Sequence, residues 1–341
     1  MDNSAASAYV YAKAGGILAR SFVGQNASRL FSVKSLRDLH SLLFSGEVPS
    51  VPEMMLSKII EEKAEEQFIS QFVSLIENYS HPAEIFVALL RFYDYDNLKE
   101  IGAALCFGES ARPHITDIGS FSMLNYDAWP NLKAITENSP VSWYSEAPKI
   151  SEQQSADSRL DGQYIRSLWS TVEKIPESES GVAKLIRADI SARNILWVLR
   201  LKVYYKMAPE EIREKLAFAD DSARRGDVLA GEALSIIDKD VGSFDDWKDW
   251  KYRRHLNPHE DGTVWEIDPT WVEKSFRREL GAMAMRSFHK EPMSVLSMVA
   301  WFKIKQNELD NIRTVAEGLR LNIEEEQMLD VAGMAGGKKS K

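Results

Sequence analysis

The residues best suited by type and spacing to hold a metal ion are His255 and His259, which are followed by Glu260 and Asp261. On a helix, a separation of four positions brings two imidazoles to one face, as a zinc site requires. Pro258 lies between the two histidines, and a proline interrupts the helix that would align them. We therefore predict that this cluster binds no metal.

Four glutamates, Glu61, Glu62, Glu65 and Glu66, could supply paired carboxylates for general acid–base catalysis. They lie in a charge-rich run that is typical of a helix with a solvated face. Cys106 lies in the apolar stretch AALCFG, where buried filler is more typical than a nucleophile. The phosphate-binding loop, the dinucleotide fingerprint, the nucleophile elbow and the H-E-x-x-H motif are all missing. We expect no catalytic, cofactor-binding or metal-binding residues.

The segment 245–271 holds four of the nine tryptophans. Within it, Trp247 and Trp250 alternate with basic residues that include Arg253 and Arg254. Such a pattern can stack on bases or grip phosphate. It can equally pack its rings on the protein while its cations point into solvent. We favour packing and keep the first alternative open.

A different pattern recurs along the whole chain. It is a polar residue three positions before an asparagine that is followed by an aliphatic residue, and it occurs as Asp94/Asn97, Ser191/Asn194 and Glu308/Asn311. Asparagine is a poor residue inside a helix, because its amide competes with the backbone. The pattern can mark a capped helix restart, or a buried amide that bridges to a neighbouring helix. Chance spacing is the remaining alternative.

The three asparagines lie 97 residues apart (194 minus 97) and 117 apart (311 minus 194). These distances exceed a solenoid repeat of roughly 20–50 residues and suit small domains of about 100 residues. We predict an all-α protein with three similar helical lobes at 1–112, 113–221 and 222–332. The tail 333–341 has no apolar periodicity, and we expect it to be disordered.

Individual elements follow from local patterns. We expect helices at 54–79 (one helix or two in tandem), 160–172, 222–238 and 270–288, and a short helix at 126–136. The polar segment 152–158 reads as a linker or exposed loop. The paired glycines at 15 and 16 indicate close approach of another helix. The helix around 195–199 is apolar on more than one side, so we expect it to be the most enclosed of its lobe.

Composition excludes several classes of protein. The chain has 341 residues, of which 44% are hydrophobic, and a formal net charge of −9. An acidic balance argues against a main role on nucleic-acid backbones, although a local basic patch stays possible. The first eight residues do not read as a signal peptide. The longest uncharged apolar-rich run, 292–302, is much shorter than the roughly 20 residues of a membrane span. Any work at a membrane would go through a protein partner.

Three stretches that carry the recurring pattern resemble one known family. DYDNLKEIGAAL, ARNILWVLRLK and NELDNIRTVAEGL are similar to the C-subunit family of V/A-type rotary ATPases (ATP synthases), whose counterpart in the eukaryotic vacuolar enzyme is the d-subunit. The resemblance implies three lobes in a pseudo-threefold, funnel-like arrangement with a central depression. This sequence departs from the family pattern at Ser191, which replaces an acidic residue, and in the tryptophan-rich segment.

The resemblance also implies a function. Such a protein belongs to the central stalk, has no catalytic site, and lies at the cytoplasmic mouth of the proteolipid ring, where it receives the central shaft. Another part of the complex would hydrolyse the nucleotide, and the coupling ion, proton or sodium, stays open. Trp247, Trp250, Arg253 and Arg254 would suit contact with a partner, whereas the three asparagine patterns would build the lobes. A stand-alone helical scaffold or adaptor is the alternative, and co-purification with a ring and shaft separates the two.

Overall fold

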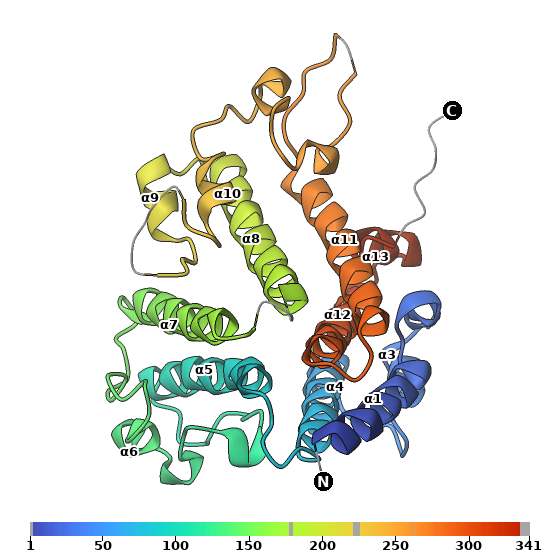
Figure 1. The fold of residues 1–341 in the computed structure, drawn as a ribbon, viewed down its shortest axis with the longest axis vertical. Coiled ribbons are helices and arrows are strands. Elements are labelled where there is room, and N and C mark those ends of the chain that lie inside the picture. Colours follow the sequence, from blue (N-terminus) through green and yellow to red (C-terminus); the bar gives the residue numbers. More distant parts are fainter. Residues whose placement is uncertain (1–2, 177–179, 221–225, 261, 335–341) are drawn as a thin grey trace.

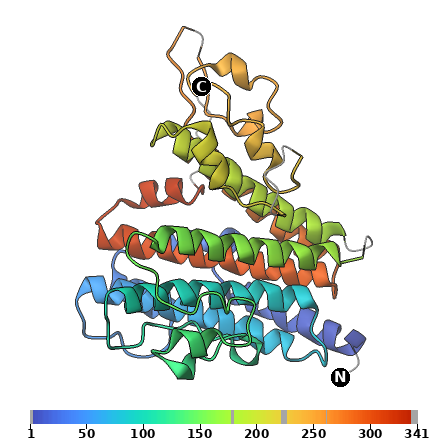
Figure 2. The ribbon, with the colours of Figure 1, turned by 90° about the vertical axis from the view of Figure 1, so that its left-hand side faces the viewer.

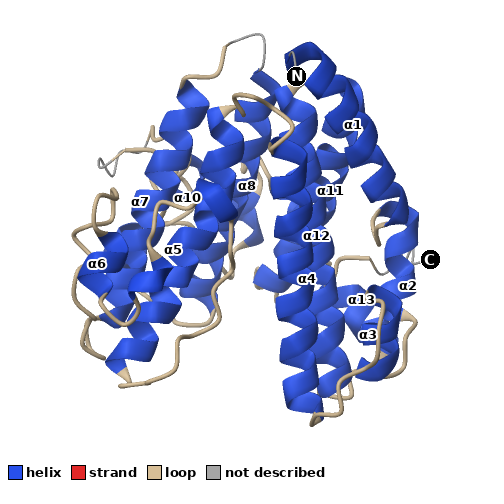
Figure 3. Cartoon of the chain, turned by 90° about the horizontal axis from the view of Figure 1, so that it is seen from below, coloured by secondary structure: helices blue, strands red, loops and turns tan. Residues whose placement is uncertain are grey.

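The fold is described from a computed structural model that covers residues 3–176, 180–220, 226–260 and 262–334. Over these residues every regular element is a helix (Figure 3), so the prediction of an all-α protein is confirmed. The long helices are α1 (Asn3–Arg20), α4 (Glu53–Ile76), α5 (Glu84–Cys106), α7 (Gln153–Glu173), α8 (Ser180–Val203), α11 (Pro269–Lys290) and α12 (Val295–Arg320). The shorter α-helices are α2 (Ser28–Phe31), α3 (Leu36–Leu43), α6 (Leu132–Thr136), α9 (Pro209–Glu214), α10 (Gly231–Leu234) and α13 (Glu325–Val331).

The 3₁₀ turns among the described residues are η1 (Gly24–Ala27), η2 (Gly119–Phe121), η3 (Tyr126–Ala128), η5 (Phe244–Trp247) and η6 (Arg253–His255). The short helix expected at 126–136 is divided between η3 and α6.

Helix starts follow the local sequence signals. The Asp268 carboxylate accepts the backbone N–H of Thr270 at 2.9 Å, and Pro269 occupies the first turn of α11. Ser294 Oγ accepts the N–H of Ser297 at 3.2 Å at the start of α12. These side chains satisfy N–H groups that a helix end leaves without intrahelical partners.

Three local expectations are wrong. The segment 152–158 is largely helical, since α7 begins at Gln153, and its polar residues form exposed turns of that helix. Of 222–238, residues 222–225 lie outside the described part, and beyond them only α10 is helical. Asp227 accepts the N–H groups of Leu229 and Ala230, and its carbonyl oxygen accepts that of Gly231, so it has the hydrogen bonds of an N-cap and the helical turns begin only after it. A Cβ placed on Gly15 or Gly16 would meet no atom within 4 Å, so this pair does not mark a close helix contact.

In the described part of the chain, buried apolar side chains form three clusters. One joins the second half of α5 to α6 and α7, and another joins the second half of α8 to the region 212–276. The largest lies between α1, α3, α4, α12 and the first halves of α5 and α8. The two smaller clusters cross the expected boundaries at 112/113 and 221/222. The lobes as ranges, and their pseudo-threefold relation, stay a prediction.

We call the largest cluster the shared core, and the two smaller ones the α5–α7 cluster and the α8–α11 cluster. Along α5 and α8, the buried side chains belong first to the shared core and then, from the recurring pattern onward, to one of the smaller clusters. In α5, Tyr93 belongs to the largest cluster and Tyr95 to the α5–α7 cluster. In α8, Ile190 belongs to the largest cluster and Ala192 to the α8–α11 cluster. In α12 the buried apolar residues on both sides of the pattern stay in the largest cluster.

The two ends of the described chain pack together. Trp301 Nε1 in α12 donates a hydrogen bond to the carbonyl oxygen of Ala14 in α1 at 3.1 Å, and Lys34 pairs with Glu325 at 2.7 Å. Figure 1 shows the first helices, in blue, beside α12 and α13. In Figure 2 the long helices α5, α7 and α12 run in nearly the same direction. Across the described residues, no helix combines the length and apolar character of a membrane span.

Candidate functional site

The three asparagine patterns lie at equivalent places on α5, α8 and α12. Asn97, Asn194 and Asn311 are only 4%, 4% and 3% exposed. Their polar partners three positions earlier, one helical turn away, are buried as well. We call each asparagine with its partner a slot, numbered from the N-terminus, because two of the three hold a following segment of chain.

In the first slot, the Asn97 amide pairs with the backbone of one residue. Its Oδ1 accepts the N–H of Thr116 and its Nδ2 donates to the carbonyl oxygen of Thr116, both at 2.9 Å. The Asp94 carboxylate accepts the N–H of Met123 at 2.8 Å and the hydroxyls of Ser122 and Tyr126 at 2.7 Å each. Burial raises the pKa of Asp94, and these three donors oppose that shift.

The second slot repeats this arrangement. Asn194 Oδ1 accepts the N–H of Ala217 at 2.9 Å, and Nδ2 donates to the carbonyl oxygen of Ala217 at 2.8 Å. Ser191, which replaces the acidic residue, donates its hydroxyl to the carbonyl oxygen of Leu229 at 3.1 Å. Asp227 supplies the missing carboxylate from the loop itself, since it accepts the N–H groups of Leu229 and Ala230.

The third slot differs. Glu308 Oε1 accepts the N–H of Phe22 at 2.5 Å, so it holds the segment that follows α1. The Glu308 carboxylate also pairs with Lys305, which donates to Ser21 Oγ at 3.0 Å. Asn311 Oδ1, however, is buried without a hydrogen-bond partner among the described residues. The two filled slots are therefore structural, and the third has unused hydrogen-bonding capacity.

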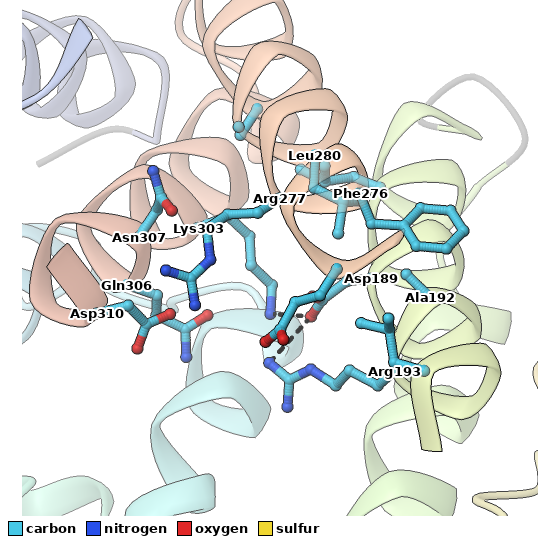
Figure 4. A pocket seen from close by; sticks show the side chains of 15 residues that line it. Asp189, Ala192, Arg193, Phe276, Arg277, Leu280, Lys303, Gln306, Asn307 and Asp310 are labelled. Atoms are coloured by element: carbon cyan, nitrogen blue, oxygen red, sulfur yellow. Dashed lines mark hydrogen bonds and ion pairs between the residues drawn. The ribbon is translucent and has the colours of Figure 1, made fainter. Parts of the chain in front are cut away.

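A charged cleft of about 200 Å³ lies beside the slots, between α8, α11 and α12 (Figure 4). At its base, Asp189 Oδ2 pairs with Lys303 Nζ at 2.7 Å and with Arg193 Nη2 at 3.4 Å. Burial on its own raises the pKa of Asp189, but attraction to Arg193 and Lys303 outweighs it and lowers the pKa to about 2. Burial lowers the pKa of Lys303, and Asp189 partly opposes that shift.

The cleft carries both signs of charge. Its acidic lining residues are Asp189, Glu273 and Asp310, and its basic ones are Arg193, Arg277 and Lys303. Burial raises the pKa of Asp310, and Arg277, Arg313 and Arg193 oppose the shift. Charges held at fixed positions on three packed helices favour a partner of complementary pattern over a simple ion.

One face of α8 extends the cleft. Arg193, Trp197 and Arg200 follow at steps of four and three residues, so they share one face of α8. Tyr204, in the turn directly after α8, continues the spacing, and its N–H donates to the carbonyl oxygen of Arg200 at 2.9 Å. We call these four residues the α8 face. The Arg193 side chain is 60% exposed, and Trp197 and Tyr204 are 43% and 56% exposed. Tryptophan, tyrosine and arginine are the residue types enriched at the energetic centres of protein interfaces.

Neighbouring elements hold the α8 face in place. Arg200 pairs with Glu273 of α11 at 2.5 Å, and the Tyr204 hydroxyl lies 3.2 Å from Thr270 Oγ1. A cavity of about 430 Å³ lined by Arg193, Trp197 and Arg200 continues from the cleft toward α7 and α9. The arrangement can bind a protein partner in a fixed orientation.

The tryptophan–arginine group expected to contact a partner is divided by the structure. Trp247 and Trp250 are 0% and 3% exposed in the α8–α11 cluster, and Trp247 Nε1 donates to the carbonyl oxygen of Asp240 at 2.7 Å. Arg253 and Arg254 are exposed. Partner contact in this region stays a prediction; Arg253 and Arg254 are its exposed side chains, and Arg254 also pairs with Glu279 of α11 at 2.5 Å.

The two histidines considered as metal ligands each contact neighbouring side chains of the protein. His255 lies 3.0 Å from Glu279 Oε2 and 2.7 Å from Ser275 Oγ, and burial lowers its pKa. His259 stacks on Phe244 with ring centres 4.6 Å apart.

The glutamates considered for acid–base catalysis and Cys106 also lie among other protein groups. Glu65 accepts the Thr116 hydroxyl at 2.7 Å and pairs with Arg313. Burial raises the pKa of Glu61, and Cys106 is a half-buried free thiol.

Sequence reasoning did not find the α8 face. It predicted the helix around 195–199 to be the most enclosed of its lobe. The helix does bury Ile195, Val198 and Leu199, yet Trp197 between them is exposed. The 4–3–4 spacing of large aromatic and arginine side chains was the available signal.

Comparisons with known proteins give a consistent result. Residues 10–331 match the model of a family described as ATP synthase (C/AC39) subunit. The chain is also similar to a protein of Treponema pallidum (strain Nichols) described as an uncharacterized protein, with 31% identity over 324 residues and 93% of each chain covered.

Proposed function

Because this chain belongs to the ATP synthase (C/AC39) subunit family, we propose that it is a non-catalytic coupling subunit in the central stalk of a V/A-type rotary ATPase. In this role it joins the rotor shaft to the proteolipid ring of the membrane. ATP hydrolysis or synthesis is thereby coupled to proton or sodium transport. Family membership supports a place in a rotary ATPase, and the position within it is our proposal.

The observation that carries the proposal is the α8 face beside the charged cleft. A coupling subunit transmits torque, so its contact with the shaft needs fixed, directional groups on a rigid support. The α8 face offers Arg193, Trp197 and Arg200 on one long helix and Tyr204 in the turn directly after it, and both aromatic rings are exposed. The ion pair of Asp189 with Lys303 ties that helix to α12. We propose that the shaft binds here.

We place the contact with the proteolipid ring at a different surface, which includes Arg253 and Arg254. Both side chains are exposed, and they lie in the segment between α10 and α11. Basic side chains there suit acidic partner loops at the cytoplasmic side of a membrane complex. The chain would then be peripheral to the membrane through its partners.

Co-purification tests the shaft contact. A tagged chain with Trp197→Ala and Tyr204→Ala should retain shaft subunits about tenfold less than the unmodified chain, because truncating interface centres commonly costs more than 1 kcal/mol each. Phe107→Ala is the matched control, since Phe107 is an aromatic residue 64% exposed at the end of α5. Equal loss in both variants would contradict the assignment of the α8 face.

A second variant tests the ring contact. Arg253→Glu with Arg254→Glu should weaken retention of the proteolipid ring and leave shaft retention unchanged. A chain that purifies with neither ring nor shaft would contradict the coupling role and leave the stand-alone helical scaffold or adaptor.

A further inference from the structure

The third slot has an asparagine at the same place as the other two, but this asparagine holds no segment of the described chain. Asn97 and Asn194 each present Oδ1 to a peptide N–H at 2.9 Å. Asn311 is 3% exposed, and its Oδ1 accepts no hydrogen bond from the part of the chain that is described. A buried acceptor without a donor is costly, so its persistence needs an explanation.

The chain that follows α12 reaches this slot without filling it. Thr116 follows its asparagine by 19 residues (116 minus 97) and Ala217 by 23 (217 minus 194). The corresponding residues after Asn311 include Gly333 and Met334. Their N–H groups donate to Asp330 and Leu329, and Gly333 has a φ of 72°. These bonds end α13, so the same N–H groups are not free for Asn311.

A cavity adjoins the slot. It has a volume of about 260 Å³ and lies between α11, α12, the segment after α1 and residues 332–334. Arg277 lines it together with Asn311, and Arg277 Nη1 is a second buried atom without a partner among the described residues. One acceptor therefore lacks a donor and one donor lacks an acceptor. A peptide segment carries both kinds of group, and Arg277 is shared with the charged cleft, where it lies near Asp310.

The charge of the cavity narrows the choice of occupant. Its charged lining residues are Arg277 and Arg278, and no acidic residue among those described lines it. The chain's own last residues include Lys338, Lys339 and Lys341, whose charge is unfavourable beside two arginines. An acidic segment is the complementary occupant.

We propose that the third slot binds an extended acidic segment of another polypeptide. A backbone N–H of that segment donates to Asn311 Oδ1, as in the two filled slots, and a carbonyl or carboxylate oxygen accepts from Arg277. Arg278 attracts the acidic side chains at the rim. The proposal does not depend on the coupling role or on the α8 face.

Nuclear magnetic resonance of the full-length protein tests it. The side-chain amide signals of Asn97, Asn194 and Asn311 are followed while the blocked pentapeptide Gly-Glu-Gly-Glu-Gly is added. We expect saturable movement of the Asn311 signal only, because the other two amides are already paired. The lysine counterpart of the probe should bind about tenfold more weakly.

Two variants decide between the occupants. Asn311→Leu keeps the volume and removes the amide, so probe binding, followed on signals of Gly281 and Ala282, should be lost. Deleting residues 335–341 should leave the Asn311 signal of the free protein unchanged. A signal that moves on this deletion would assign the slot to the chain's own tail. A flat titration with the acidic peptide would mean that the slot holds only water and would overturn the proposal.

Discussion

The first and third slots show how one residue pattern serves different ends in one molecule. Asn97 ties the chain that follows α5 back to the helix through both atoms of its amide, at the point where α5 passes from the shared core to its own core. Asn311 lies on a helix that stays in the shared core, and 30 residues of the sequence follow it (341 minus 311). A buried amide fixes the fold where it meets the following chain and is left available where it does not.

The largest expected effect is a loss of stability in the first slot that exceeds the loss in the second. Asp94→Ala removes the acceptor of one backbone N–H and two hydroxyls, and should lower the free energy of unfolding by about 3 kcal/mol. Ser191→Ala should cost only about 1 kcal/mol, because Asp227 carries the carboxylate role there. Denaturant unfolding measures both. Equal costs would show that Asp227 does not compensate for the missing acid.

The next effect tests whether the two filled slots are equivalent. Asn97→Ala and Asn194→Ala each strand a buried peptide group, that of Thr116 or Ala217, and should each destabilise the protein by about 2 kcal/mol. Hydrogen exchange of these two N–H groups provides a local measurement. Exchange that stays slow in the variants would contradict the pairing.

The pH dependence of the free energy of unfolding tests the ion pair between Asp189 of α8 and Lys303 of α12, the helices that carry the second and third slots. The pKa of Asp189 is lowered from 3.8 to about 2, so its stabilising contribution is present above pH 3.8 and is lost as the pH falls through about 2. The shift corresponds to about 2 kcal/mol, reduced at neutral pH because burial lowers the pKa of Lys303.

The Asp189→Asn variant provides the comparison. It should be less stable than the unmodified protein at pH 7, and the difference should close as the pH approaches 2. A difference that does not change with pH would contradict an ion-pair role for Asp189.

The smallest effect distinguishes the third slot most clearly. Asn311→Leu removes an acceptor that has no donor among the described residues, so thermal unfolding should shift little or move upward, because replacing an unsatisfied polar group by an apolar one of similar size is near neutral. A loss as large as that of Asn97→Ala would mean that Asn311 has a partner in the folded protein.

Sequence reasoning predicted the helical class and placed the recurring pattern on three helices, because helical periodicity and the recurring polar pair are local signals. It placed 152–158 in a loop, since an exposed polar turn of a helix has the composition of a linker. It favoured packing of the Trp247 and Trp250 rings on the protein, which their burial agrees with, but it also offered both rings for partner contact, because alternation with basic residues fits both burial and exposure.

Two other features depend on tertiary structure. Asp227 replaces the missing acid of the second slot from 36 residues away (227 minus 191), and no local pattern links the two residues. The orphaned Oδ1 of Asn311 follows from the capping of α13, which uses the N–H groups that would otherwise be near it. Such three-dimensional compensation is invisible in the residue order.

The most direct test of the coupling role is a cryo-electron microscopy map of the assembly purified through a tag on this chain. We predict a rotary ATPase in which the shaft packs on Trp197 and Tyr204 of the α8 face. An assembled complex in which those two side chains face solvent, with the shaft bound elsewhere, would contradict the account.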